Sequence, residues 1–117
     1  MAQEDAKRIL VVDDEQPVCE AISEILKLDG HEVETANTLA QAIELSKENH
    51  FDLVFLDYAL ADITGDKVLS VLRRLNPRQK IVIISGQKPY PLVGQADFLI
   101  RKPCTAEIIR KAVVRFA

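Results

Sequence analysis

This chain has few cysteines, no long apolar run and no block of like charge. Its two cysteines, Cys19 and Cys104, lack the spacing of metal ligands and do not amount to a disulfide framework, so a reducing compartment is the simplest environment. No apolar stretch approaches the roughly 20 residues that a membrane-spanning helix needs. The first eight residues are charged and lack the apolar core of a signal peptide. These absences predict a cytoplasmic protein that has no contact with a membrane.

The balance of charge excludes a further class of partner. The net charge is −3 at pH 7 and no basic patch is visible, so nothing favours nucleic-acid binding by this domain. Hydrophobic residues make up 48% and charged residues 28%, which is ordinary for a soluble globular protein. A length of 117 residues suits one compact core. We expect residues 1–117 to form a single domain.

Strand and helix patterns alternate along the chain. We expect strands over 7–13, 31–35, 52–57, 80–85 and 97–101, and helices that begin near Pro17, after Asn37 or Thr38, after Gly65 and at Thr105. This alternation predicts an α/β fold, in which a parallel sheet is covered by helices on both faces. Between the fourth and fifth strands, Pro89 and Pro91 forbid a regular helix.

Charged side chains follow three of the apolar runs. Asp13 and Asp14 come after the first strand, Asp57 ends the third, and Lys102 comes after the fifth. Because the carboxyl ends of parallel strands meet at one edge of the sheet, and open α/β sheets bind ligands there, we expect these side chains to lie together. Mutually repelling acids beside a single ammonium are poorly explained by stability. The function is therefore expected at this edge.

These residues and their neighbours resemble a known family. The acidic pair Asp13-Asp14, Asp57, Gly65, Ser85 and Lys102-Pro103 together match the receiver domain of two-component response regulators, also called the CheY-like domain. The resemblance covers the chain from Ile9 to Val114. It implies a doubly wound, flavodoxin-like sheet of five parallel strands in the order 2-1-3-4-5, which agrees with the predicted alternation.

The resemblance implies a role for each acid. Asp57 would be the phosphoacceptor, and its carboxylate would attack a phosphohistidine to form an aspartyl phosphate. Asp13 and Asp14 would hold Mg²⁺ (or Mn²⁺), together with Asp57 and the backbone carbonyl of Ala59. Hard divalent cations prefer such oxygen ligands.

The resemblance also implies how the phosphoryl group is sensed. Lys102 would pair with Asp57 and then with the phosphoryl group, and Ser85 would donate a hydroxyl hydrogen bond to a phosphoryl oxygen. Pro103 stands where the family commonly has a cis peptide bond after the lysine. The domain would catalyse its own phosphorylation and dephosphorylation, so it is not an enzyme in the turnover sense. Its partners would be a sensor histidine kinase or a histidine phosphotransfer protein, and an output partner or fused output domain.

Three positions depart from the family pattern. Ala61 replaces the usual proline four residues after the phosphoacceptor. Leu99 occupies the usual aromatic position three residues before the lysine, and we expect the adjacent Phe98 to lie on the other face of its strand. The segment between Ser85 and Lys102 is several residues shorter than is typical. We therefore expect the fourth helix, around residues 87–95, to be short or missing, which predicts an altered output surface.

Other interpretations of these residues remain open. An Asp-Asp pair after a strand is more often a turn or a helix cap than a metal site, and Asp57, Ser85 or Lys102 alone would be unremarkable. An aspartyl-phosphate hydrolase usually has Asp-x-Asp after the first strand, whereas the pair here is adjacent. A flavodoxin-type cofactor binder would need a phosphate loop where this chain has acids. A receiver that serves only for protein interaction also remains an alternative.

Overall fold

The computed structural model describes residues 6–57, 65–86, 96–102 and 104–117. It has five strands and four helices in these ranges: β1 (Arg8–Val12), α1 (Gln16–Leu28), β2 (Glu32–Ala36), α2 (Leu39–Glu48), β3 (Leu53–Asp57), α3 (Gly65–Leu75), β4 (Ile81–Ser85), β5 (Phe98–Arg101) and α4 (Ala106–Phe116). No helix within these ranges is long and apolar enough to cross a membrane.

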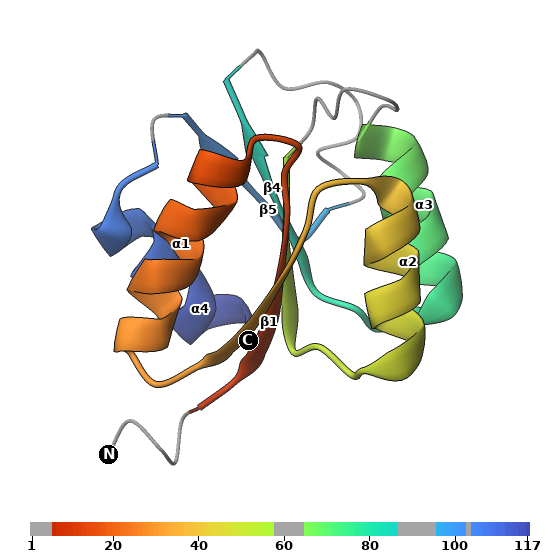
Figure 1. Ribbon diagram of the computed structural model, residues 1–117, viewed down its shortest axis with the longest axis horizontal. Helices are drawn as coiled ribbons and strands as arrows, with labels where there is room; N and C mark the ends of the chain where they lie inside the picture. Colours follow the sequence, from red (N-terminus) through yellow and green to blue (C-terminus); the bar gives the residue numbers. More distant parts are fainter. Residues whose placement is uncertain (1–5, 58–64, 87–95, 103) are drawn as a thin grey trace.

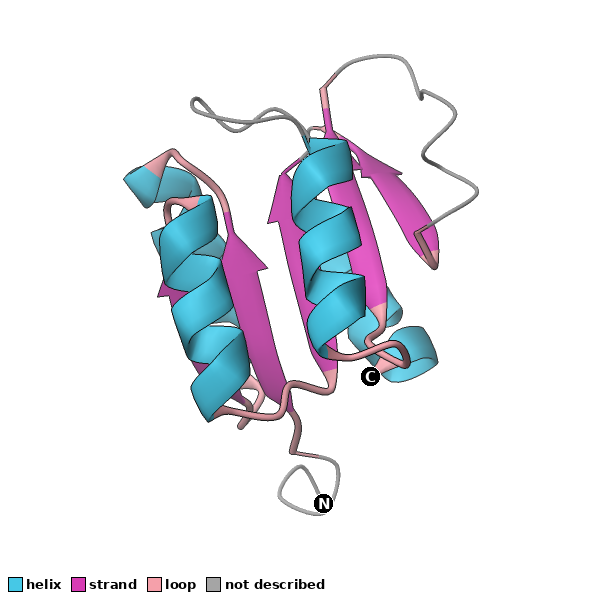
Figure 2. Cartoon of the chain, turned by 90° about the vertical axis from the view of Figure 1, so that its right-hand side faces the viewer, coloured by secondary structure: helices cyan, strands magenta, loops and turns pink. Residues whose placement is uncertain are grey.

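The strands form one parallel sheet in the order β2-β1-β3-β4-β5. Helices α1 and α4 cover one face of the sheet, and α2 and α3 cover the other (Figure 1). Figure 2 views the molecule from the side of α2 and α3, with the strands behind them. The predicted α/β architecture and strand order are confirmed.

Alternation along the central strands divides the core in two. In β1, Leu10 and Val12 face the cluster under α2 and α3, whereas Ile9 and Val11 face the cluster under α1 and α4. All residues of β3 and β4 are buried, as expected for strands that are covered on both faces. This burial explains why the strands read as continuous apolar runs.

Local sequence signals set the helix boundaries. Pro17 lies in the first turn of α1, where its missing N–H costs no hydrogen bond. Thr38 caps α2 by accepting a hydrogen bond from the backbone N–H of Gln41, and Thr105 caps α4 in the same way. Gly30 follows α1 with φ of 89°, a conformation that favours glycine.

Several predicted boundaries differ from the structure by one residue. The first strand is Arg8–Val12 rather than 7–13, and the last helix begins at Ala106 because Thr105 is its cap. The described residues contain four helices, none of them between β4 and β5, where the sequence predicts a short or missing fourth helix. Residues 87–95, on which this prediction falls directly, lie outside the described residues.

Candidate functional site

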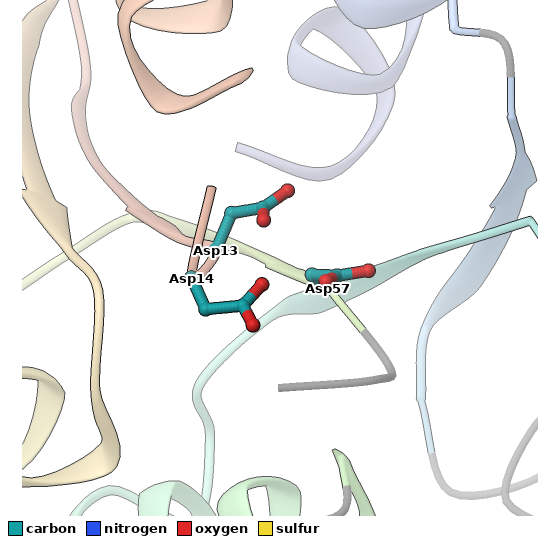
Figure 3. Close-up of side chains that lie close together, drawn as sticks. All are labelled: Asp13, Asp14 and Asp57. Carbon is teal, nitrogen blue, oxygen red and sulfur yellow. The ribbon is translucent and has the colours of Figure 1, made fainter. Parts of the chain in front are cut away.

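Three carboxylates gather at the carboxyl edge of the sheet. Asp13 and Asp14 directly follow β1, and Asp57 is the last residue of β3, the strand paired with β1. One oxygen from each carboxylate lies within 4.8 Å of the others. Figure 3 shows the three side chains grouped at the ends of the two strands. The sequence-based expectation that these acids share one edge is therefore met.

The acids differ in exposure. Asp13 and Asp57 are buried, with 2% and 6% of their surface exposed, whereas Asp14 is half-buried. The backbone of Asp13 donates a hydrogen bond to the carbonyl of Ala36 at the end of β2. Its Oδ1 accepts one from the N–H of Glu15 at 3.0 Å. The inner part of the cluster is thus fixed by neighbouring strands and by the start of α1.

Lys102 brings one positive charge to this cluster. Its Nζ lies 3.4 Å from Oδ1 of Asp57 and 3.9 Å from Oδ2 of Asp13. The backbone N–H of Lys102 donates to the carbonyl of Ser85 at 2.8 Å, which ties the end of β5 to the end of β4. The aliphatic stem of Lys102 runs past Gly86, where an added Cβ would lie 3.8 Å from its Cδ. The lysine therefore reaches the acids from the edge strand over the end of β4.

Burial and charge perturb the titration of these groups. Burial is the main reason that the pKa of Asp13 rises from 3.8 to about 6, and the carboxylates of Asp57 and Asp14 contribute to the rise. The N–H of Glu15 and the ammonium of Lys102 act in the opposite direction. Burial also disfavours the Lys102 ammonium, but the charges of Asp57 and Asp13 outweigh it and raise the pKa of Lys102. The site has an excess of negative charge that a cation would relieve.

The donor set suits a hard divalent cation. The three acids offer only oxygen atoms, and the pKa of Asp13 is raised because its charged form lacks sufficient compensation. Mg²⁺ is bound in proteins by one or two carboxylates and keeps several waters, which the half-exposed side of Asp14 would admit. Asp13, Asp14 and Asp57 therefore fit a divalent cation, and such a cation would supply positive charge beside the Asp57 carboxylate.

Comparison with known proteins identifies the family to which this arrangement belongs. The model of the response regulator receiver domain matches residues 9–114. The chain belongs to the response regulator receiver domain family. The receiver domain is 35% identical, over 97% of its length, to the alginate biosynthesis transcriptional regulatory protein AlgB of Pseudomonas putida, but it spans only 27% of that protein.

Two solved structures that contain bound ions share this fold. TrrA of Thermotoga maritima in complex with Mg²⁺-BeF is 29% identical, with a TM-score of 0.86, and the match covers 95% of this receiver domain and 99% of TrrA. A response regulator of Burkholderia pseudomallei with a phosphorylated aspartic acid and a calcium ion is 25% identical, with a TM-score of 0.84, over 92% and 66% of the two chains.

The structure places some of the predicted site residues and leaves others outside its described ranges. Ser85, the last residue of β4, is buried and pairs with Arg101 of β5, and it directly follows Ile84, which pairs with Asp57. Ala59, Ala61 and Pro103, for which a metal-ligating carbonyl, a changed loop and a cis peptide were predicted, lie outside the described residues.

Leu99 and Phe98 lie on opposite faces of β5. Leu99 packs against the cluster under α2 and α3. Phe98 stacks on Phe116 of α4, with ring centroids 5.4 Å apart, and the Arg115 guanidinium lies 5.9 Å from the Phe98 ring. Phe98 could reach the other face only if β5 shifted its register by one residue. Its ring therefore packs against α4 and does not take the place of Leu99.

Two residues that the sequence does not assign to the site contact its backbone. Asn37, expected only at the start of the second helix, has a side-chain Nδ2 that donates to the backbone carbonyl of Asp13 at 2.9 Å. The strand order 2-1-3-4-5 contained a signal for this contact, because it places the residue after β2 beside the residue after β1. Cys19 also donates to that carbonyl, at 3.2 Å from Sγ, and burial raises the pKa of its thiol to about 11.

Proposed function

We propose that this receiver domain, residues 1–117, accepts a phosphoryl group on Asp57 from a phosphohistidine and uses Mg²⁺ (or Mn²⁺) to do so. The observation that carries the proposal is the convergence of Asp13, Asp14 and Asp57 with the ammonium of Lys102 at one edge of the sheet. Two structural relatives, one with Mg²⁺-BeF and one with a phosphorylated aspartic acid, support it.

The Asp57 carboxylate suits the role of nucleophile. One of its oxygens would attack phosphorus in line with the P–N bond of the donor, so that a P–O bond forms and the imidazole nitrogen leaves with its electron pair and takes up a proton. Two unit charges of like sign about 4 Å apart repel by roughly 4 kcal/mol at a protein-like dielectric, so the acceptor needs nearby positive charge. A bound divalent cation supplies part of that charge.

The residues of this chain would divide the remaining work. Asp13 and Asp14 would hold the cation, with Asp57 and the carbonyl of Ala59 as further ligands. Lys102 already lies in hydrogen-bonding reach of Asp57 and would transfer this contact to the phosphoryl oxygens. Ser85, at the end of the strand beside β3, would donate its hydroxyl to the same group.

The partners follow from this chemistry. A histidine kinase or a histidine phosphotransfer protein would supply the phosphoryl group, in the cytoplasm. The output would be a separate partner or a fused domain, as the length of the transcriptional relatives suggests. The receiver would act as a switch that modifies itself and then shifts between two conformations, rather than as a turnover enzyme.

Intact-protein mass spectrometry tests the proposal. The domain is incubated with acetyl phosphate or with a phosphohistidine donor, in Mg²⁺ or in EDTA. One added phosphoryl mass that requires Mg²⁺ and is absent in Asp57→Asn is the expected result. Asp52→Asn is the matched control: this half-buried carboxylate lies before the start of β3, at the end opposite Asp57, and accepts a hydrogen bond from the N–H of Arg8. We expect this variant to keep the adduct. A parent protein that gains no mass with either donor would leave the interaction-only alternative.

A further inference from the structure

We propose that Asn37 is a positioning residue for the metal-binding acid pair, an inference that rests on the proposed function. Asn37 directly follows β2, and its side-chain amide donates to the carbonyl of Asp13 at 2.9 Å. It touches neither the cluster of carboxylate oxygens nor Lys102 in any contact of the described residues. Its influence would therefore pass through the main chain of Asp13.

The peptide groups of Asp13 are held from both sides. Its N–H donates to the carbonyl of Ala36 at 3.0 Å, and its carbonyl accepts from Nδ2 of Asn37 and from Sγ of Cys19. The carbonyl carbon of Asp13 is bonded to the nitrogen of Asp14, so the same group sets the direction in which both acidic residues leave the strand. Fixing this one carbonyl orients two of the three proposed ligands at once.

Asn37 is itself held by the first turn of α2. Its backbone N–H donates to Oε1 of Gln41 at 2.7 Å. The backbone N–H of Gln41 in turn donates to the hydroxyl of Thr38, which caps the helix. The Asn37 amide also lies 3.6 Å from Sγ of Cys19. The backbone of Asn37 is thus held by the side chain of Gln41, and its amide group lies beside the buried thiol of α1.

The contact is separable from folding. When Asn37 is removed, the carbonyl of Asp13 keeps a partner in the thiol of Cys19, so no buried acceptor is left without a donor. The thiol of Cys19 is a weak donor, so it would hold the carbonyl of Asp13 less firmly than the amide of Asn37 does. We therefore expect removal of the Asn37 side chain to disturb the orientation of Asp13 and Asp14 more than it lowers the free energy of unfolding. Partners of metal ligands in the second layer commonly contribute 10- to 100-fold to metal affinity.

Mn²⁺ binding provides the test, because it needs no phosphoryl donor. The free Mn²⁺ concentration is followed by electron paramagnetic resonance for the parent, Asn37→Ala and the matched control Thr38→Ala. Thr38→Ala removes the cap of the same helix but no contact to Asp13. We expect Asn37→Ala to raise the Mn²⁺ Kd by about tenfold. We expect Thr38→Ala to leave the Mn²⁺ Kd near that of the parent, although it lowers the resistance to urea at least as much as Asn37→Ala does.

A second measurement separates positioning from chemistry. In phosphorylation by acetyl phosphate, Asn37→Ala should raise the Mg²⁺ concentration for half-maximal rate by the same factor, while the rate at saturating Mg²⁺ stays close to the parent's. If Asn37→Ala does not fold, Asn37→Ser replaces it, because the shorter hydroxyl does not reach the carbonyl.

The outcomes are distinguishable. A parent that binds Mn²⁺ and is phosphorylated, with an Asn37 variant whose Kd equals that of the parent or of Thr38→Ala, overturns the positioning role alone. A parent that binds no Mn²⁺ overturns the metal assignment and the positioning role together.

Discussion

The ammonium of Lys102 lies 3.4 Å from Oδ1 of Asp57, although Asp57 ends β3, Lys102 follows β5, and β4 lies between these two strands in the sheet. The side chain crosses the end of β4, where its stem passes Gly86, and it also approaches Asp13. One lysine therefore offsets part of the negative charge of two buried acids.

Removal of this charge should destabilise the metal-free protein. In EDTA at pH 7, we expect Lys102→Ala to lower the free energy of unfolding by about 1–2 kcal/mol, because Asp13 and Asp57 then lose the ammonium that lies beside both carboxylates. Urea denaturation measures the change. Lys111→Ala is the control, since Lys111 forms an exposed pair with Glu107 that contributes about 0.5 kcal/mol or less. An equal loss in the two variants would contradict the role of Lys102.

The raised pKa of Asp13 predicts how stability depends on pH. Because its pKa is about 6 in the folded protein and 3.8 in the unfolded chain, the folded state binds more protons between these values, and stability falls as pH rises through this window. In EDTA, Asp13→Asn removes the penalty. We expect it to stabilise the protein by about 1–2 kcal/mol at pH 7 and by much less at pH 4.

Urea denaturation at both pH values checks this prediction, and Asp52→Asn serves as a carboxylate control away from the cluster. A gain for Asp13→Asn that is the same at pH 4 and pH 7 would show that the ionisation of Asp13 is not its cause.

Asp97 joins three elements at the opposite edge of the sheet. Its Oδ2 accepts from Nη2 of Arg73 on α3 at 2.9 Å and from the N–H of Ile81 at the start of β4 at 2.8 Å. Asp97→Ala should therefore lower the free energy of unfolding by about 2 kcal/mol, since a partly buried N–H and a guanidinium lose their partner. Glu32→Ala, which breaks the exposed pair with Arg8, should cost less than about 0.5 kcal/mol.

Thermal denaturation of the two variants side by side distinguishes these contributions. A melting temperature of Asp97→Ala that is no lower than that of Glu32→Ala would contradict the stabilising role of Asp97.

The two cysteines should differ in reactivity. Cys19 is fully buried and the pKa of its thiol is raised to about 11, whereas Cys104 is half-buried, with a pKa that burial raises as well. At pH 8, a thiol reagent should label Cys104 slowly and Cys19 only as the protein unfolds. Peptide mapping after timed labelling, with a urea-denatured sample as reference, reads out both rates. Rapid labelling of Cys19 in the folded protein would contradict its burial.

Much of the fold could be predicted from the local pattern of apolar residues and helix-capping residues. The buried strands β3 and β4 appear as unbroken apolar runs, and Thr38, Thr105 and Pro17 carry the helix boundaries through hydrogen bonds or dihedral preferences within a few residues. One-residue errors arose at strand ends, where the pattern of apolar residues does not report which backbone groups pair.

The sequence predicted which charged residues form the site but not the hydrogen bonds that hold them. The topology of a parallel sheet requires that Asp13, Asp57 and Lys102 end at the same edge, so their proximity followed from the order of the elements. The contact of Asn37 with the Asp13 carbonyl did not follow, because hydrogen bonds between loops depend on the side-chain directions of neighbouring strand ends.

The sequence by itself determined the alternation of strands and helices, the two-sided core and the set of charged residues at the carboxyl edge, since these depend on periodicity and on chain order. Only the tertiary structure decided which charges are buried and how they compensate one another. The raised pKa of Asp13, the reach of Lys102 across β4 and the commitment of Phe98 to α4 all arise from packing between segments that are distant in the sequence. Burial and distance set electrostatic energy, and neither is a property of a residue's neighbours along the chain.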